Sequence, residues 1–350
     1  MVGVALPLDD DESGSSASAL TRLFGRGRLV MLAVTAVALY LVAPSLTEVL
    51  QAWPRLSDIA PGWFALMLLA EMLSFSAVWY LQRLAFKDAG WFELITSHLV
   101  SNAVSRVVPG GAATGGALQF TMMRRAGADP ATAAAALTAL SVMTTASLFV
   151  LPIISVPAII AGMPVPDTIA RAAWIGGIML AVVGAGGVYL ARSERALRGM
   201  GQIIERFRPT SDGQTPLPER LVSERDAVVS SLGVHWVRAA MASVAKWLFD
   251  FYALLAALVA VGDTRQVSLV LLAYVAGAVL SMVPITPGGI GFVEAGLTAA
   301  LIAAGVSPGR AVLATLAYRL VSYWLPILAG VVAWIAFRVR FSSLPATADT

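Results

Sequence analysis

The stretch that decides the fold is PITPGGIGFVE at residues 284–294, built around Pro287-Gly288-Gly289. Proline lacks a backbone N–H and glycine loosens a helix, so this motif interrupts the long apolar sequence in which it lies. Backbone groups freed by such a break cannot face lipid, so they must be buried in protein or line a water-filled cavity. Taken alone, the motif fits equally a ligand-binding break or a tight helix hairpin packed through small residues.

A second Pro-Gly-Gly motif, Pro109-Gly110-Gly111, lies 178 positions earlier in the chain. At the same offset Gly127 matches Gly305, and Asp129-Pro130 matches Ser307-Pro308, in each case an N-cap residue before a proline at the first helical position. The apolar segments on either side of the two motifs also align. The order of full span, broken stretch and full span therefore occurs twice.

The number of crossings between the two motifs predicts how the copies are related. Three apolar spans, an odd number, separate the broken stretches, so the second copy should be inverted in the membrane relative to the first. Inverted repeats with discontinuous helices are typical of transporters whose binding site lies near the bilayer midplane. The pairing of the motifs therefore favours a binding role over simple packing.

The remaining apolar segments are long enough to cross a hydrocarbon core, which takes about 20 residues. Full spans are expected at residues 29–42 (fading past Pro44 towards Leu50), 61–84, 131–160, 169–190, 237–261 and 311–337, and broken stretches at 91–125 and 267–304. The predicted fold class is thus an all-α integral membrane protein. It has about six full transmembrane helices plus two Pro-Gly-Gly-broken re-entrant hairpins arranged as an inverted repeat.

The domain prediction follows from this pattern. It comprises a disordered acidic tail at 1–24, a transmembrane domain at 25–340 and a disordered tail at 341–350. Within the domain, repeat one covers about 60–160, a polar cytoplasmic segment covers 192–234, and repeat two covers about 237–338.

Composition excludes several classes of function. The 350 residues are 58% hydrophobic and 13% charged, whereas soluble domains are about 25% charged. Without cysteine and with only two histidines, no metal site is expected. No phosphate-binding loop or hydrolase motif occurs, so we expect no enzyme activity and no cofactor. Expected partners are membrane lipids, with a homo-oligomer or an envelope lipid-synthesis enzyme as further candidates, and no nucleic acid.

Lysine and arginine predict the orientation. With six crossings and re-entrant hairpins, most of them fall on one side, and only four arginines remain for the other: Arg55, Arg171, Arg265 and Arg310. The expectation is a bacterial inner-membrane protein with both termini in the cytoplasm.

Several charged residues lie inside predicted spans, where each costs roughly 2.5–3.5 kcal/mol on insertion scales and usually faces a partner or a cavity. Glu71 is near the middle of its span and fits either a coupling role or a buried packing role. Lys246 and Asp250 are four residues apart on one helix face, so they are expected to pair, as a structural pair or as coupling charges.

The other membrane charges lie beside the two motifs. Glu294 follows Gly291 by less than a turn, Arg319 lies within the last span, and Arg106 precedes the first motif by three residues. An arginine beside a broken helix can hold a phosphate or the glutamate. His98 and Asn102 share a face with Arg106, as a wet cavity wall or as part of an amphipathic interfacial helix. The candidate substrate-binding residues are Arg106, Pro109, Gly110, Gly111, Pro287, Gly288, Gly289, Gly291, Glu294 and Arg319.

The run at 284–294, followed by Gly305-Val306-Ser307 and by Tyr318-Arg319, resembles the lysylphosphatidylglycerol synthase transmembrane family, a flippase-like, UPF0104-type domain. The resemblance covers about residues 25–340. It implies translocation or accommodation of a lipid between leaflets, typically an aminoacylated phosphatidylglycerol. Members fused to a soluble aminoacyl-transferase domain make that lipid; this chain is expected to be a stand-alone member without it, and not the synthase.

The first repeat departs from the pattern that the family implies. Its members often carry an acidic residue after the first glycine turn and an arginine in the next helix, whereas Gly116 and Ser141 occupy these positions here. The role of the first repeat in binding is therefore an open alternative.

Three hypotheses follow. The first is a flippase or scramblase-like transporter of a phospholipid or lipid-linked head group, bound in a polar cleft by Glu294, Arg319 and Arg106. The second is an ion-coupled secondary transporter of a small anionic solute, with Glu71, Asp250 or Glu294 carrying a proton. The third is a membrane scaffold or regulator of envelope lipid synthesis, in which the charges serve stability.

Overall fold

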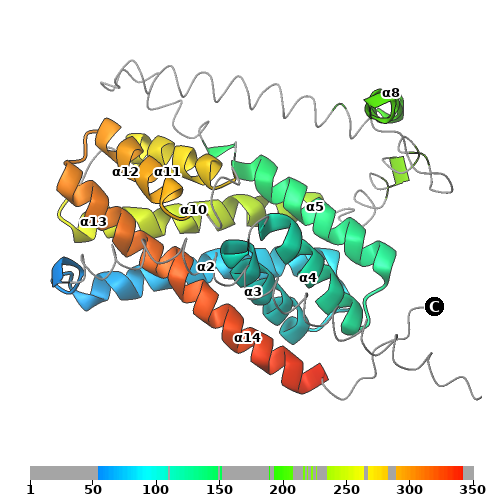
Figure 1. Ribbon diagram of the computed structural model, residues 1–350, viewed down its shortest axis with the longest axis horizontal. Helices are drawn as coiled ribbons and strands as arrows, with labels where there is room; N and C mark the ends of the chain where they lie inside the picture. Colours follow the sequence, from blue (N-terminus) through cyan, green and yellow to red (C-terminus); the bar gives the residue numbers. More distant parts are fainter. Residues whose placement is uncertain are drawn as a thin grey trace, which may run out of the picture.

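The computed structural model describes residues 54–108, 111–148, 150–151, 189, 193–207, 216, 219, 222–223, 226, 235–263, 267–282 and 289–341 (Figure 1). Every regular element within these ranges is a helix. The predicted tails and the predicted span at 29–42 lie outside the described residues, as does the span at 169–190 apart from Tyr189. Pro109, Gly110, Pro287 and Gly288 also lie outside them.

The described helices follow the predicted order closely. They are α2 (Pro61–Ala85), α3 (Trp91–Val107), α4 (Gly111–Arg125), α5 (Pro130–Leu148), α8 (Glu194–Phe207), α10 (Trp236–Ala260), α11 (Val267–Ser281), α12 (Phe292–Ala303), α13 (Pro308–Arg319), the π-helical turn η3 (Leu320–Trp324) and α14 (Leu325–Phe341). The last three form one continuous element. It begins three residues before the predicted span because Pro308 takes the first helical turn, where a missing N–H costs nothing.

Within the described residues, three elements have the length and composition to cross a membrane. They are Pro61–Ala85, Trp236–Ala260 and Pro308–Phe341, with 25, 25 and 34 residues. At 1.5 Å per residue, a helix of this length reaches about 37 Å or more, beyond the roughly 30 Å hydrocarbon core. The helices α11 and α12 are apolar but shorter, as expected of a broken stretch. The count of six full spans stays a prediction.

Two helices carry large apolar side chains that nothing in the described chain covers. On α2 these include Leu66, Leu68 and Leu69, and on α14 Val332 and Ile335, each 44–67% exposed. Apolar surface of this extent is rare on soluble proteins and marks contact with lipid or protein. Multi-pass membrane character therefore rests on the structure as well as on composition.

The helices pack as pairs drawn from both halves of the chain (Figure 1). Helix α2 lies along α10, and α14 lies along α3, while α3 with α4 and α11 with α12 form the two hairpins. The first hairpin is close-packed through glycine: a Cβ on Gly111 or Gly115 would overlap Ser105 of α3. Small residues at helix contacts are what membrane helices use to approach one another.

Helix bounds recur at the offset of 178 found in the sequence. Helices α5 and α13 begin at Pro130 and Pro308, and α4 and α12 end at Arg125 and Ala303. Four helices of the first half thus have counterparts in order in the second half. The inverted relation of the two copies stays a prediction.

Candidate functional site

The first group of buried charges joins α12 to α13. Arg319 Nε donates a hydrogen bond of 2.7 Å to Glu294 Oε1, and both residues are less than a tenth exposed. Glu294 lies in the first turn of α12, which begins after Gly291 in the left-handed region at φ 77°. The second oxygen, Glu294 Oε2, and the second nitrogen, Arg319 Nη2, are buried without hydrogen-bond partners in the part of the chain that the structure describes. Sequence analysis predicted both residues, and the structure places them in contact.

The π-helical turn η3 begins directly after Arg319 and presents Tyr323 to it. π-Helical turns are rare and occur frequently at functional sites. The Tyr323 ring is 2% exposed, and the Arg319 guanidinium lies 4.0 Å from its centroid. A cation over an aromatic face within about 6 Å is attracted by the ring quadrupole.

Arg106 comes to the same ring from the last turn of α3. Its guanidinium carbon lies 5.0 Å from the Tyr323 centroid, and its Nη1 donates to the Ser322 carbonyl at 2.6 Å. Within the described residues no carboxylate lies at salt-bridge distance from Arg106. Two arginines, one from the first hairpin and one from the last span, therefore converge on one aromatic ring, and Glu294 contacts only Arg319 of the two.

Two guanidinium groups this close repel each other, and burial strengthens the repulsion because the interior screens charge less than water does. An anion that contacted both arginines would stabilise the arrangement. Guanidinium groups form paired hydrogen bonds to phosphate oxygens, and Arg319 Nη2 is a buried donor still available for one. The geometry is thus suited to a phosphate.

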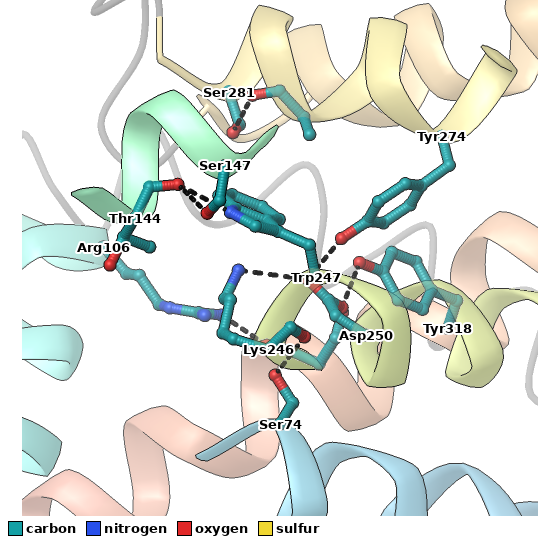
Figure 2. A network of polar contacts seen from close by, with 12 residues as sticks. Ser74, Arg106, Thr144, Ser147, Lys246, Trp247, Asp250, Tyr274, Ser281 and Tyr318 are labelled. Atoms are coloured by element: carbon teal, nitrogen blue, oxygen red, sulfur yellow. Dashed lines mark hydrogen bonds and ion pairs between the residues drawn. The ribbon is translucent and has the colours of Figure 1, made fainter. Parts of the chain in front are cut away.

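A second buried group surrounds Asp250 in α10 (Figure 2). Its carboxylate accepts hydrogen bonds from the hydroxyls of Tyr274, at 2.9 Å, and Tyr318, at 2.6 Å. Lys246 Nζ lies 3.5 Å from the same carboxylate, which confirms the predicted i,i+4 pair. Lys246 also lies over the Trp247 ring, 3.1 Å from its centroid. Asp250 is therefore held as an anion by three partners.

Glu71 of α2 faces this second group. Ser74, one turn later in α2, donates to the Lys246 carbonyl at 2.9 Å and fixes α2 against α10. Glu71 is 5% exposed and its Oε1 has no hydrogen-bond partner. It lies within electrostatic reach of Asp250, Lys246 and Arg106. Arg106 therefore interacts electrostatically with charged residues of both groups.

The remaining polar residues of α3 have separate roles. His98 Nδ1 accepts a hydrogen bond from Trp79 Nε1 at 3.2 Å, so its ring serves the α2–α3 contact. The Asn102 side-chain oxygen is buried without a partner in the described chain. His98, Asn102 and Arg106, which were predicted to share one face, therefore do not form one polar wall. Of the three, only Arg106 contacts Tyr323 and Ser322.

The glycines differ between the two hairpins. Gly111 packs against Ser105, whereas Gly289 and Gly291 adopt left-handed backbone conformations at φ 72° and 77°. Gly116 and Ser141, which match Glu294 and Arg319 at the repeat offset, are exposed. The first hairpin therefore lacks a counterpart of the Glu294–Arg319 pair and contributes Arg106 instead.

Sequence reasoning missed three tyrosines that bind the charged groups: Tyr274, Tyr318 and Tyr323. One signal was present in the sequence. All three lie well inside apolar stretches, whereas interfacial tyrosines lie at span ends.

Comparison with known proteins agrees with this reading of the chain. The family described as "Lysylphosphatidylglycerol synthase TM region" matches residues 28–330. A UPF0104 membrane protein of Pyrococcus horikoshii is 41% identical over 61 residues, which is 17% of this chain and 18% of that protein. The chain thus aligns with less than a fifth of this relative.

Proposed function

Because the chain belongs to the lysylphosphatidylglycerol synthase transmembrane-region family, we propose that it moves a phospholipid between the two leaflets of a membrane. The observation that supports this proposal is that the guanidinium groups of Arg106 and Arg319 both lie against the Tyr323 ring. Within the described residues, Arg319 Nη2 has no hydrogen-bond partner. The part of the lipid that this site fits is the phosphate of the head group.

The depth of the site supports a role in translocation rather than in surface binding. Arg319 and Tyr323 are the twelfth and sixteenth residues of a continuous 34-residue helix, and Glu71 is the eleventh of 25 in α2. At 1.5 Å per residue these groups lie about 15 Å or more from either end of their helices. A head group that leaves one leaflet must pass this depth, where the two arginines offer its phosphate a counter-charge.

Movement of the two hairpins relative to each other would provide alternating access to the site. In inverted-repeat transporters, one repeat rocks against the other around a fixed midplane site. Here the site is built from α3 on one side and from α12, α13 and η3 on the other. Motion of the first hairpin relative to the second would open and close the contact between Arg106 and Ser322.

Lipid translocation in reconstituted vesicles tests this proposal. Fluorescent phosphatidylglycerol in the outer leaflet is destroyed by a membrane-impermeant reductant, and the protected fraction reports transfer between leaflets. We expect Arg319→Gln to slow transfer by about tenfold or more, because hydrogen bonds to a charged group contribute about 1.5–3 kcal/mol. The matched control is Arg340→Gln, since Arg340 is exposed and pairs with Glu93 outside the site. Equal transfer in protein-free vesicles overturns the proposal.

The charge group around Asp250 favours a second candidate, an ion-coupled transporter of a small anionic solute. A buried carboxylate with an unpartnered oxygen, such as Glu71, is typical of proton-carrying sites in transporters. Uptake of a soluble organophosphate into vesicles, in the absence of any lipid transfer, would favour this candidate.

The proposal also covers the location of the protein and the source of its lipid. It would reside in a bacterial inner membrane with both termini in the cytoplasm, act without chemical catalysis, and receive its lipid from the bilayer or from an envelope lipid-synthesis enzyme. A homo-oligomer is compatible with the apolar outer faces of α2 and α14.

A further inference from the structure

Among the described residues, two of the buried charges have no counter-ion at salt-bridge distance. Three cations and three carboxylates lie in the two groups: Arg106, Lys246, Arg319, Glu71, Asp250 and Glu294. Lys246 pairs with Asp250 and Arg319 pairs with Glu294. Arg106 and Glu71 are left over, and each lies within electrostatic reach of the other.

Glu71 is placed to gain and lose a proton. It is buried, its Oε1 has no hydrogen-bond partner among the described residues, and it lies within electrostatic reach of Asp250. Two ionised carboxylates repel each other in a buried setting, so this pair favours the uptake of one proton. Asp250 is already bound by two tyrosine hydroxyls and Lys246, which hold it as the anion. Glu71 is therefore the carboxyl of the two that is free to take up a proton.

We propose that protonation of Glu71 and binding of a lipid phosphate at Arg106 and Arg319 are linked, so that each lipid head group crosses the membrane together with one proton. This inference rests on the function proposed above and specifies its energy coupling. With the site empty, an ionised Glu71 balances Arg106. With phosphate bound, the phosphate balances Arg106 and Glu71 carries the proton.

The physical reason is electroneutrality in a low-dielectric interior. An uncompensated buried charge costs several kcal/mol, so the states in which charges balance are favoured over those with one anion too many or too few. Phosphate and an ionised Glu71 compete for the same arginine. By linkage, the factor by which protonation strengthens phosphate binding equals the factor by which phosphate strengthens protonation.

Other titratable and charged groups face this carboxyl from each neighbouring helix. They are Lys246 and Asp250 of α10, Arg106 of α3, Tyr274 of α11 and Tyr318 of α13, with His98 of α3 within reach of Lys246 and Arg106. Arg106 donates to the Ser322 carbonyl, both tyrosines donate to Asp250, and Lys246 is paired with Asp250. His98 is the group whose titration must be separated from that of Glu71.

The test is the affinity of the full-length protein in detergent for short-chain dihexanoyl phosphatidylglycerol, measured by calorimetry from about pH 5.5 to about pH 8.5. A phosphodiester keeps one negative charge over this range, so any pH dependence belongs to the protein. We expect affinity to rise as pH falls, by up to about tenfold per pH unit for one linked proton. Glu71→Gln, which mimics the protonated side chain, should bind with the wild type's low-pH affinity at every pH.

Two controls separate the carboxyl from its surroundings. Glu93→Gln changes a carboxylate on α3 that pairs with Arg340 away from the site and should leave the pH profile unchanged. His98→Gln keeps an acceptor for Trp79 and should also keep the profile. A profile that is flat in the wild type, or that persists in Glu71→Gln, overturns the proton linkage while lipid transfer stands. Absence of binding at every pH overturns both proposals.

Discussion

Arg106 of α3 and Tyr323 of the π-helical turn contact each other twice: the Tyr323 hydroxyl donates to the Arg106 carbonyl at 2.8 Å, and the Arg106 guanidinium lies 5.0 Å from the ring centroid. The two residues are 217 positions apart. This double contact joins the end of the first broken hairpin to the middle of the last span. Arg319 covers the same ring, so Tyr323 fixes the separation of the two arginines.

Tyr323→Phe should lower stability slightly and leave lipid transfer largely intact, whereas Tyr323→Ala should abolish transfer. The phenylalanine variant keeps the ring and loses one hydrogen bond, which costs about 1 kcal/mol of unfolding free energy and leaves lipid transfer largely intact. The alanine variant removes a fully buried ring, which costs about 3–5 kcal/mol and frees both arginines, so transfer should be lost. Thermal unfolding in detergent and the leaflet assay measure the two effects. Loss of transfer in both variants to the same degree would show that the hydroxyl, not the ring, positions the arginines.

Asp250→Asn should destabilise the protein more than the double variant Lys246→Met/Asp250→Leu. The single change leaves the Lys246 ammonium buried without its counter-ion, a loss of about 3–5 kcal/mol, while the apolar pair removes both charges. Unfolding temperature of the two purified variants checks this. If the double variant is the less stable of the two, the tyrosine contacts to Asp250 contribute more than the ion pair does.

Gly115→Ala should open the α3–α4 hairpin, whereas Gly116→Ala should be neutral. A Cβ on Gly115 would overlap the Ser105 side chain and lie 2.6 Å from the Ser101 carbonyl, but a Cβ on Gly116 meets nothing within 4 Å. Because alanine is a better helix former, Gly116→Ala should even gain about 0.5–1 kcal/mol. Folded yield and unfolding temperature provide the comparison. Equal stability of the two variants would contradict the close packing of this hairpin.

Glu294→Gln should tighten binding of short-chain phosphatidylglycerol by several-fold. Glu294 occupies Arg319 Nε at 2.7 Å, so the carboxylate competes with phosphate for the arginine. Removing its charge leaves the Arg319 guanidinium without its carboxylate partner. Calorimetry at a fixed pH measures the change, with Glu93→Gln as the control for loss of a carboxylate. Weaker binding in Glu294→Gln would instead assign Glu294 the role of holding Arg319 in position.

Much of the helix order could be read from local sequence. The Asp129-Pro130 and Ser307-Pro308 pairs predicted helix starts that the structure places at Pro130 and Pro308. The spacing of Lys246 and Asp250 predicted their ion pair, because residues four apart face each other on any helix. These features depend on a few neighbouring residues, so no knowledge of the tertiary structure was needed.

The contacts that make the site could not be read in this way. Nothing local to Arg106 indicates that its partner is the Ser322 carbonyl, 216 positions away, or that a π-helical turn brings Tyr323 to it. Residues 109–110 and 283–288, where the helices break, also lie outside the described ranges, so the geometry of the breaks stays a prediction.

The sequence alone determined that this is a helical membrane protein with two Pro-Gly-Gly breaks at a fixed offset, because hydropathy, proline and glycine act through the local backbone. It also singled out Arg106, Glu294 and Arg319 as charges that need a partner. Only the tertiary structure decided which charges meet: it paired Arg319 with Glu294 and brought Arg106 to the same tyrosine. It also left Glu71 as the carboxylate facing Arg106. The reason is that counter-ion choice in a low-dielectric interior depends on distances between helices, which the packing of α2 on α10 and of α14 on α3 establishes.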